Sequence, residues 1–497
     1  MSRGINAIFE SLSEGSDLRA SLLELKKILK EDDGSKADES RISILKKLLE
    51  DKDPKVRQNA AFCLGEFKAQ DCLQVLFESY KKDSIKYNKA VYIEALSKLD
   101  LSPVAGELAG IAENIRNSEI AAEDRKHVIG EMRALNVALR PYFHTVHEFT
   151  GFDLVNEAVL LTNRNFKDIT CKELGTIPHK EFSAGVMIKT RHLEKVLDIR
   201  TYSELLFVPA SQMELTADPY EAARVICEHG IVEYLRERHS NGDAPFYFRV
   251  EYKTKTKDSG NKSDFEKSLA GALELESKWA LINSVDDYET EFRIIEGSDG
   301  KLKLLIGMRT LPDKRFLYRK ETISTGIKPY LAALLIRLSA DQIRDNACVM
   351  DLMCGSGILL IERNAFKPAR LLYGVDIYGP AVKAAHANIK AAGLEKKTEL
   401  ITRDISDFKH EHKVDEIYAD TPMVTSSWPE EKLQKLFETF FRKADELLDI
   451  DGYVFVYTHN KDLFKTTAAK RGFCLIRSFE ISKVEKSWYF VFNRSKM

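Results

Sequence analysis

The segment VMDLMCGSGILLIE, residues 349–362, constrains the fold of this 497-residue chain more than any other stretch. An apolar run ends in Asp351, a turn containing Gly355 and Gly357 follows, and a second apolar run begins at once. Glycine lets the backbone turn sharply and lets a ligand approach the main chain without a Cβ in between. The pattern therefore predicts a buried strand, a ligand-binding turn and a helix.

The same alternation continues through the C-terminal third of the chain, after an amphipathic helix predicted at 324–339. Strand, crossover helix and parallel strand in succession predict a doubly wound α/β sheet. Strands are expected at 347–353, 369–377, 398–404, 416–420 and 453–459, and helices at 358–366, 381–393 and 433–448.

Acidic residues end three of these predicted strands: Asp351, Asp376 in YGVDIYGP and Asp404 in ITRDISD. Each alone is typical of a helix cap, but ligands of open α/β sheets bind at the carboxyl ends of the strands, so three together indicate a ligand site. A P-loop is excluded by spacing, and G-x-G-x-x-G is incomplete because Leu360 occupies its third glycine position. Asp351 suits a ligand that carries an ammonium group better than a bare pyrophosphate.

The N-terminal region, residues 1–148, is predicted to be helical. In DKDPKVRQNAAFCLGEF, residues 51–67, Asp53 can cap a helix and Pro54 suits its first turn. A comparable helix, SIKYNKAVYIEALSKL, follows about 32 residues later, and that period is typical of an α-solenoid. DPKVRQNAAFCLGEF resembles a HEAT repeat, with a plain helical bundle as the alternative. Both interpretations imply packing or binding of a protein partner, and neither implies catalysis.

The middle region, residues 149–320, alternates short strands with helices and predicts small α+β layers. One continuous helix is expected over 218–238, a polar stretch with several lysines over 253–264, and a tight hairpin at the sequence SDG, residues 298–300. The last predicted domain spans residues 321–497.

Composition limits the classes of function. The formal charge of −2 gives no global attraction to nucleic acid or to an anionic membrane, so any polyanion site must be local. Charged residues interrupt the first apolar residues, and long uncharged apolar runs are absent, so a cytoplasmic protein without a membrane segment is expected. The histidines lack metal-binding spacing, and no metal is expected. Seven cysteines without a C-x-x-C pair are expected to be reduced and buried.

The C-terminal two thirds of the chain resemble the S-adenosylmethionine (SAM)-dependent methyltransferases, and more narrowly the RNA guanine-N2 methyltransferases that carry a THUMP domain. DLMCGSGILLIE is similar to that family's D-P-x-C-G-S-G-T-x-x-I-E, and GVDIYGPAVKAAHANIKAAGL is similar to its G-x-D-x-x-x-x-x-x-x-A-x-x-N-x-x-x-A-G. LYRKETISTGIKPYLAALLIRLS is similar to its linker and first helix, and LLTNRNFKDITCKELG and the hairpin ending in LLIGMRT are similar to its ferredoxin-like and THUMP parts.

This resemblance implies three parts: an all-α HEAT-like solenoid, an α+β ferredoxin-like and THUMP region, and a C-terminal α/β Rossmann-like methyltransferase domain. It implies SAM as cofactor and structured RNA, tRNA or rRNA, as partner. The cofactor-binding residues that it implies are Asp351, Cys354, Gly355, Gly357, Asp376, Ile377 and Asp404. The candidate phosphate contacts are Lys253, Lys255, Lys257 and Lys262, for which a solvated loop is the alternative.

One motif departs from the family. Where the family carries [ND]-P-P-[YF], this chain carries Asp420, Thr421, Pro422 and Met423. In the family, the first residue and the carbonyl of the first proline accept hydrogen bonds from the amine that is methylated, and the aromatic ring stacks on the flipped base. Trp428 could supply a replacement ring from the same loop, or could be a packing residue before Pro429.

The resemblance favours a SAM-dependent RNA N-methyltransferase, acting on the N2 of guanine, with Asp420, Thr421 and Pro422 as catalytic residues and Met423 and Trp428 as substrate contacts. The altered motif keeps a second hypothesis open, a catalytically silent RNA-binding or scaffold protein that retains the fold. A DNA amino-methyltransferase is a third, but it leaves the THUMP-like region unexplained.

Overall fold

The computed structural model describes residues 4–31, 38–143, 145–254, 259–297 and 300–494. The chain forms two compact units. The first contains Met1–Gly151 and Pro209–Thr310, and the second contains Phe152–Val208 and Leu311–Met497. The predicted middle region is therefore divided between the two units. Among the described helices, none combines the length and apolar character that a membrane span requires.

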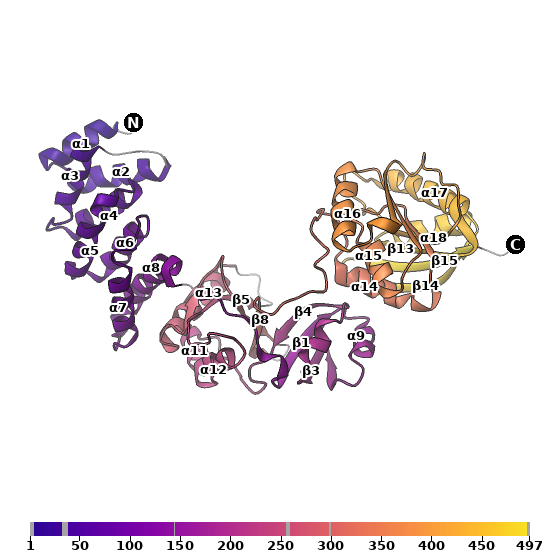
Figure 1. The fold of residues 1–497 in the computed structure, drawn as a ribbon, viewed down its shortest axis with the longest axis horizontal. Helices are drawn as coiled ribbons and strands as arrows, with labels where there is room; N and C mark the ends of the chain where they lie inside the picture. The colour runs from indigo at the N-terminus through magenta and orange to yellow at the C-terminus, as the bar shows by residue number, and fades with distance from the viewer. Residues whose placement is uncertain (1–3, 32–37, 144, 255–258, 298–299, 495–497) are drawn as a thin grey trace. The chain divides into compact units, whose positions relative to one another are not determined.

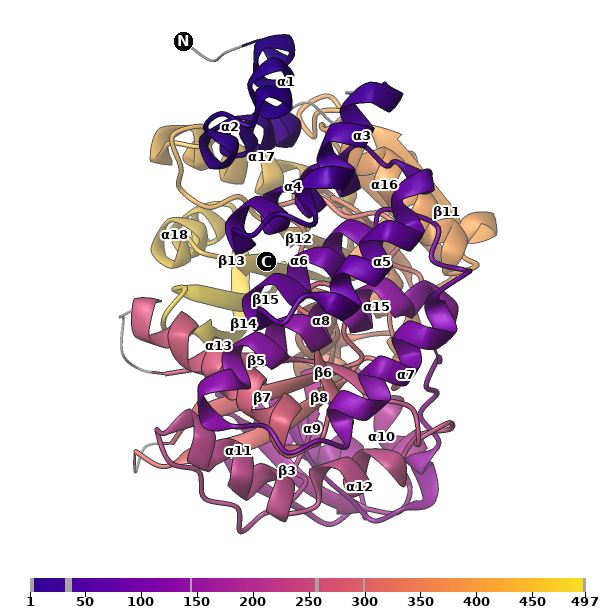
Figure 2. The same cartoon turned by 90° about the vertical axis from the view of Figure 1, so that its left-hand side faces the viewer.

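The N-terminal helices of the first unit stack in antiparallel pairs, as Figure 2 shows for α1 to α8. Helices α2, α4, α6 and α8 pack against one another in succession, and each also packs against the helix before it. This arrangement confirms the predicted solenoid. The helices are α1 (Ile5–Glu14), α2 (Leu18–Glu31), α3 (Glu39–Leu48), α4 (Pro54–Glu66), α5 (Leu73–Lys82), α6 (Lys86–Leu96), α7 (Ala105–Arg116) and α8 (Arg125–Phe143).

The segment that resembles a HEAT repeat forms helix α4 and its connection to the next repeat. Asp53 caps α4, where its side chain accepts a hydrogen bond from the Lys55 backbone N–H. Arg57 donates two hydrogen bonds to the buried Asp83, which also accepts one from Asn88 on α6. Because Asp83 lies between α5 and α6, the motif arginine joins one repeat to the next.

The rest of the first unit is a small α/β layer. Strand β5 pairs in parallel with β6 and β7, and β7 pairs antiparallel with β8. The predicted helix over 218–238 is wrong in one respect, because it is interrupted at Gly230, whose φ of 72° lies in the left-handed region. The elements are α11 (Pro219–Glu228), α12 (Ile231–Arg236), β5 (Phe246–Lys253), α13 (Ser259–Glu276), β6 (Leu281–Asn283), β7 (Thr290–Glu296) and β8 (Leu302–Met308). The first two residues of the predicted SDG turn lie outside the described residues.

The second unit begins with four antiparallel strands in the order β2-β3-β1-β4. Arg200 ties this segment to the C-terminal domain through two hydrogen bonds, of 2.8 and 2.7 Å, to the buried Glu362, which also accepts one from Tyr318. The glutamate that ends the D-x-x-C-G-S-G motif therefore has a structural partner. The elements are β1 (Asn156–Thr162), α9 (Lys167–Leu174), β2 (His179–Phe182), β3 (Gly185–Thr190), α10 (Leu193–Leu197) and β4 (Tyr202–Phe207).

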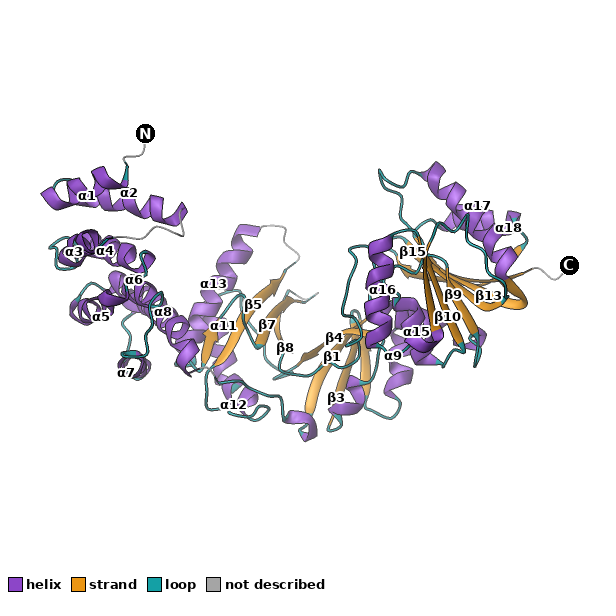
Figure 3. Cartoon of the chain, turned by 45° about the horizontal axis from the view of Figure 1, so that its top comes forward, coloured by secondary structure: helices purple, strands orange, loops and turns teal. Residues whose placement is uncertain are grey.

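The C-terminal domain is a seven-stranded sheet in the order β11-β10-β9-β12-β13-β15-β14. The first five strands are parallel, as predicted, and β14 and β15 extend the sheet in the antiparallel direction. Helices cover both faces of the sheet, with α14 to α16 packed in one core and α17 and α18 in the other (Figures 1 and 3). The helices are α14 (Pro329–Leu338), α15 (Ile358–Phe366), α16 (Gly379–Ala391), α17 (Glu430–Leu447) and α18 (Lys461–Lys470). The strands are β9 (Cys348–Asp351), β10 (Leu371–Asp376), β11 (Thr398–Thr402), β12 (Val414–Asp420), β13 (Leu448–Thr458), β14 (Phe473–Ser482) and β15 (Ser487–Arg494).

All seven cysteines lie within the described residues and are free thiols. Four of them are buried, but Cys171 and Cys227 are half-buried and Cys474, on β14, is exposed. The expectation that all are buried is therefore wrong for these three.

A buried ion pair joins the helix that follows the glycine turn to strand β12. Arg363 on α15 donates two hydrogen bonds to Glu416, and both side chains are fully buried. Glu416 also accepts hydrogen bonds from the Tyr418 hydroxyl and the Arg344 backbone N–H, so each of its oxygens has two donors. Such a pair is destabilising to break, because removal of one partner leaves the other charged and buried.

We expect Arg363→Met to lower the free energy of unfolding by about 3–5 kcal/mol, because it leaves the Glu416 carboxylate without its cation. The matched control is Arg442→Met, which removes an exposed pair with Glu446 on α17 and should cost less than about 1 kcal/mol. Urea unfolding followed by tryptophan fluorescence measures both, since Trp428 and Trp488 lie in the second unit. Equal effects of the two substitutions would contradict this account.

Candidate functional site

Asp351, the last residue of β9, is the most deeply buried acidic side chain at the carboxyl edge of the sheet. Its Oδ1 accepts a hydrogen bond of 3.0 Å from the Met353 backbone N–H, while its buried Oδ2 has no hydrogen-bond partner among the described residues. Burial raises the pKa of Asp351 well above its ordinary value, and the nearby carboxylates of Asp420 and Asp376 raise it further. A buried carboxylate in this state favours either a proton or a cationic ligand.

The glycine turn follows directly. Gly355 and Gly357 have φ values of 52° and 78°, in the region that favours glycine, and Gly357 is the N-cap of α15. The Gly355 N–H donates to Asp376 Oδ2 and the Tyr378 N–H to Oδ1, both at 2.8 Å. Asp376, at the end of β10, therefore holds the turn in place as well as facing the ligand edge.

Three further residues that the sequence assigned to the cofactor lie around this edge. Ile377 is 63% exposed. Cys354 is buried, and its Sγ would lie 3.0 Å from a Cβ on Gly374, so it packs β9 against β10. Asp404 is exposed, and its Oδ1 accepts a hydrogen bond of 2.8 Å from the Ser406 N–H. The expectation that β11 ends at Asp404 is wrong, because the strand ends two residues earlier, at Thr402.

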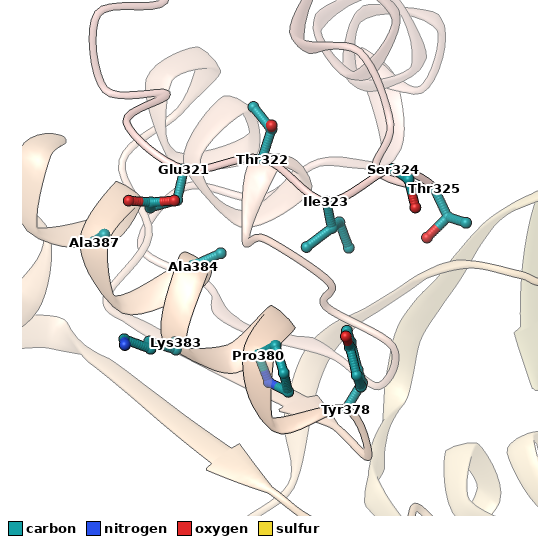
Figure 4. A pocket seen from close by; sticks show the side chains of 10 residues that line it. All are labelled: Glu321, Thr322, Ile323, Ser324, Thr325, Tyr378, Pro380, Lys383, Ala384 and Ala387. Atoms are coloured by element: carbon teal, nitrogen blue, oxygen red, sulfur yellow. The ribbon is translucent and has the colours of Figure 1, made fainter. Parts of the chain in front are cut away.

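A cavity of about 550 Å³ adjoins the glycine turn. It lies between the linker before α14 and the first half of α16, and Figure 4 shows Ile323 directed toward the helix residues. A Cβ on Gly355 would lie 3.3 Å from Ile323, so this linker passes beside the turn. The lining residues are Glu321, Thr322, Ile323, Ser324, Thr325, Tyr378, Pro380, Lys383, Ala384 and Ala387.

Asn388 on α16 holds the linker there, a role that sequence reasoning missed. Its Oδ1 accepts hydrogen bonds from Lys320 and Glu321 N–H, at 2.8 and 2.9 Å. Its Nδ2 donates to the carbonyls of Glu321 and Ser356, at 3.0 and 2.9 Å. The asparagine of the A-x-x-N motif was visible in the sequence, but its four backbone partners come from two other segments.

Asp420 ends the neighbouring strand β12, in which Tyr418 pairs with Asp351. Its side chain is half-buried, and none of the described residues donates a hydrogen bond to its carboxylate. Burial raises the pKa of Asp420 to about 7. A carboxylate so placed can accept a hydrogen bond from a ligand amine.

The first two residues after Asp420 are hydrogen-bonded to the end of β13 and to Asn460, which follows it. The Thr421 N–H donates to the Tyr457 carbonyl at 3.0 Å, and its hydroxyl donates to Thr458 Oγ1 at 2.8 Å. The Pro422 carbonyl accepts a hydrogen bond of 3.0 Å from Asn460 Nδ2. Met423 is 52% exposed and leaves the position of the family's aromatic ring without a ring.

Trp428 is half-buried and packs against the core under α17. The Lys432 ammonium lies 4.1 Å from the centroid of the Trp428 ring. The Trp428 backbone forms a tight turn with Thr425. These are the contacts of a packing residue, and its role as a substrate platform stays a prediction.

The predicted phosphate contacts are only partly within the described residues. Lys253 ends β5 and forms an ion pair with Glu251, and Lys262 on α13 lies 3.7 Å from Glu266. Lys255 and Lys257 lie outside the described residues.

Known proteins match the two ends of the chain. Residues 317–487 match the UPF0020 family, described as an RMKL-like methyltransferase domain, and residues 24–122 match HEAT repeats. The U6 snRNA (guanine-N(2))-methyltransferase THUMPD2 of Bos taurus is 26% identical over 132 residues, and that of Homo sapiens is 27% identical over 132 residues. Each alignment covers 26% of this chain and 25% of the relative, so the chain spans about a quarter of the length of these relatives.

Solved structures share the fold of the larger part of the chain. TrmN from Thermus thermophilus superposes with a TM-score of 0.52 and 20% identity, over 68% of this chain and 99% of TrmN. SMU.472, a structure in complex with SAH, superposes with a TM-score of 0.50 and 16% identity, over 69% of this chain and 99% of SMU.472. Identities this low show the fold alone. Residues 317–487 are thus similar to the RMKL-like methyltransferase domain and residues 24–122 to HEAT repeats, in agreement with the resemblance found in the sequence.

Proposed function

We propose that this chain is a SAM-dependent RNA methyltransferase that methylates an exocyclic amine, the N2 of guanine in a structured RNA such as tRNA or rRNA. The observation that carries the proposal is the pair of partner-deficient carboxylates, Asp351 and Asp420, at adjacent strand ends of the methyltransferase domain. The name of the THUMPD2 relatives supports guanine N2 as the target.

The donor set fits the cofactor. SAM carries an ammonium group, and the buried Oδ2 of Asp351 lacks the donor that such a group provides. The two glycines leave the main chain open at the turn, and Asp376 keeps lone pairs for ribose hydroxyls beyond the two backbone amides that it binds. Asp404 uses Oδ1 for its own turn and keeps the other oxygen for the adenine amine. When bound, SAM supplies a methyl group activated by the adjacent sulfonium.

The residues at the end of β12 would orient the acceptor. An amine N–H would donate to the Asp420 carboxylate and to the Thr421 carbonyl, which directs the nitrogen lone pair at the methyl group. As the bond from the nitrogen to the methyl carbon forms and the bond from that carbon to sulfur breaks, the nitrogen gains positive charge, which the ionised Asp420 would stabilise before it accepts the N–H proton that the amine loses. Orientation of this kind is the main contribution that the chain makes to an in-line transfer.

The RNA would be held outside the methyltransferase domain. Lys253, Lys255, Lys257 and Lys262 of the THUMP-like part would neutralise phosphates, which a chain of net charge −2 must do locally. The HEAT repeats would bind a protein partner and take no part in catalysis.

One observation favours a second function, a silent RNA-binding scaffold. Met423 takes the place of the family's aromatic ring, and stacking on such a ring is worth about 1–3 kcal/mol per base. A scaffold would bind cofactor and RNA yet transfer no methyl group.

The free Asp351 carboxyl has a raised pKa, so it holds a proton at pH values where an ordinary aspartate is ionised. Binding of an ammonium group requires the carboxylate, so binding of S-adenosylhomocysteine should release a proton, and affinity should rise with pH through the titration range. Calorimetric titrations in two buffers of different ionisation enthalpy measure the released proton. Asp351→Asn should weaken binding roughly tenfold to a hundredfold. It should also lower the number of protons released on binding, because an amide has no proton to release in this range. Unchanged proton release in the variant would contradict the role.

We expect Asp420→Ala to lower the rate of methyl transfer by about a hundredfold or more, with cofactor affinity retained. Since burial places the pKa of Asp420 near 7, its acceptor form is lost below that pH, and kcat/KM should rise with pH through about 7. With the cofactor saturating, so that the titration of Asp351 does not contribute, this rise should be absent in Asp420→Asn, because an amide does not titrate there.

The matched control is Asp462→Ala, which removes an exposed carboxylate from the first turn of α18 and should leave transfer unchanged. Normal turnover by Asp420→Ala would refute the assigned role. Binding of cofactor and RNA without transfer by the unmodified chain would favour the scaffold.

A further inference from the structure

The turn at residues 420–423 lacks the first of the two prolines that make the family's turn rigid. A proline fixes its own φ, and Thr421 does not. The Thr421 carbonyl is nevertheless one of the two acceptors proposed for the amine. Some other restraint must hold this carbonyl in place if the reaction is to proceed at a useful rate, because small misplacements of reacting groups are costly.

Hydrogen bonds from the end of β13 restrain Thr421 on its N-terminal side. Its backbone N–H donates to the Tyr457 carbonyl, and its hydroxyl donates to Thr458 Oγ1 at 2.8 Å. Thr421 and Thr458 are 4% and 0% exposed, so water does not compete for these bonds. Together the two bonds limit rotation about φ of Thr421, the angle that a proline would have fixed.

Asn460 restrains the peptide group that follows, between Pro422 and Met423. Its Nδ2 donates to the Pro422 carbonyl at 3.0 Å, and its own N–H donates to Thr458 Oγ1 at 3.1 Å. Pro422 in turn biases ψ of Thr421 toward extended values. The peptide that carries the Thr421 carbonyl therefore lies between two groups that are hydrogen-bonded to Thr458 and Asn460, which are 37 and 38 positions away in the chain.

The side chain of Asn460 does not cap the helix that begins after it. Asn460 is the N-cap residue of α18, and asparagine is among the preferred residues there because its side chain can accept a hydrogen bond from the first turn. In this chain it makes no such bond, and its amide is directed to Pro422 instead.

We propose that Thr458 and Asn460 are positioning residues that replace the missing proline and hold the Thr421 carbonyl and Asp420 in register for the acceptor amine. The inference rests on the proposed methyltransferase function of the same site. It also explains how the sequence Asp-Thr-Pro-Met remains compatible with catalysis.

The decisive variant is Asn460→Asp. Aspartate keeps the shape of asparagine and is equally good as an N-cap, but it cannot donate to the Pro422 carbonyl. We therefore expect only the small loss of thermal stability that one hydrogen bond accounts for, together with a fall in kcat of about tenfold or more. KM for RNA should stay within about twofold, because the substitution affects alignment and not binding. Thr458→Val, which removes the shared oxygen, should act in the same direction, and Asp462→Ala is the control on the same helix.

The result that would overturn the inference is a kcat of Asn460→Asp and Thr458→Val equal to that of the control. If the unmodified chain transfers no methyl group, the proposed function has failed, and hydrogen exchange then decides on the positioning role by itself. Faster exchange at the Thr421 amide, which donates to the Tyr457 carbonyl, in Asn460→Asp than in Asp462→Ala supports the restraint. Equal exchange in the two variants refutes it.

Discussion

Three carboxylates meet at one edge of the C-terminal sheet because the strands that carry them are parallel neighbours. Asp351 ends β9, Asp376 ends β10 on one side, and Asp420 ends β12 on the other. The carboxylates of Asp376 and Asp420 both raise the pKa of the buried Asp351. Concentrated negative charge at a buried site is unfavourable for the free protein, and a cationic ligand relieves it. The repulsion among these carboxylates thus disfavours the ligand-free fold, and its relief by a SAM-like cation would favour binding.

The surrounding structure keeps this edge in shape. Asn388 binds four backbone groups and holds the linker beside the glycine turn. Glu362 and Arg363, successive residues of α15, have different partners: Arg200, which lies between α10 and β4 in the same unit, and Glu416 on β12. The two charged residues of this largely apolar helix therefore join it to two separate segments. The sequence motif that ends in Glu362 therefore contains residues that stabilise the fold as well as residues of the candidate ligand site.

Local patterns predicted most of the fold. The strand, glycine turn and helix around Asp351, the parallel strands after it, and the solenoid with Asp53 as an N-cap follow from periodicity and capping rules that act within a few residues. The break at Gly230 escaped prediction because the apolar pattern continues across it. Strand β6 has only three residues, too few for an alternating pattern to be recognised.

The candidate site divides in the same way. The three acidic strand ends could be found from the sequence, although Asp404 lies beyond its strand and binds its own turn. Asn388 and Asn460 could not be assigned roles, since each binds backbone groups of a segment far away in the chain. Thr458 could not be assigned one either, since its partner is the hydroxyl of the distant Thr421. Backbone partners carry no side-chain signature, so tertiary structure alone shows which asparagine holds which loop.

The central claim is that this site transfers a methyl group to RNA. The most direct test is incubation of the full chain with tritiated SAM and total RNA from the source organism lacking this gene, followed by digestion and separation of the nucleosides. The account predicts label in N2-methylguanosine. Binding of the cofactor without transfer of label, or label in another nucleoside, would contradict it.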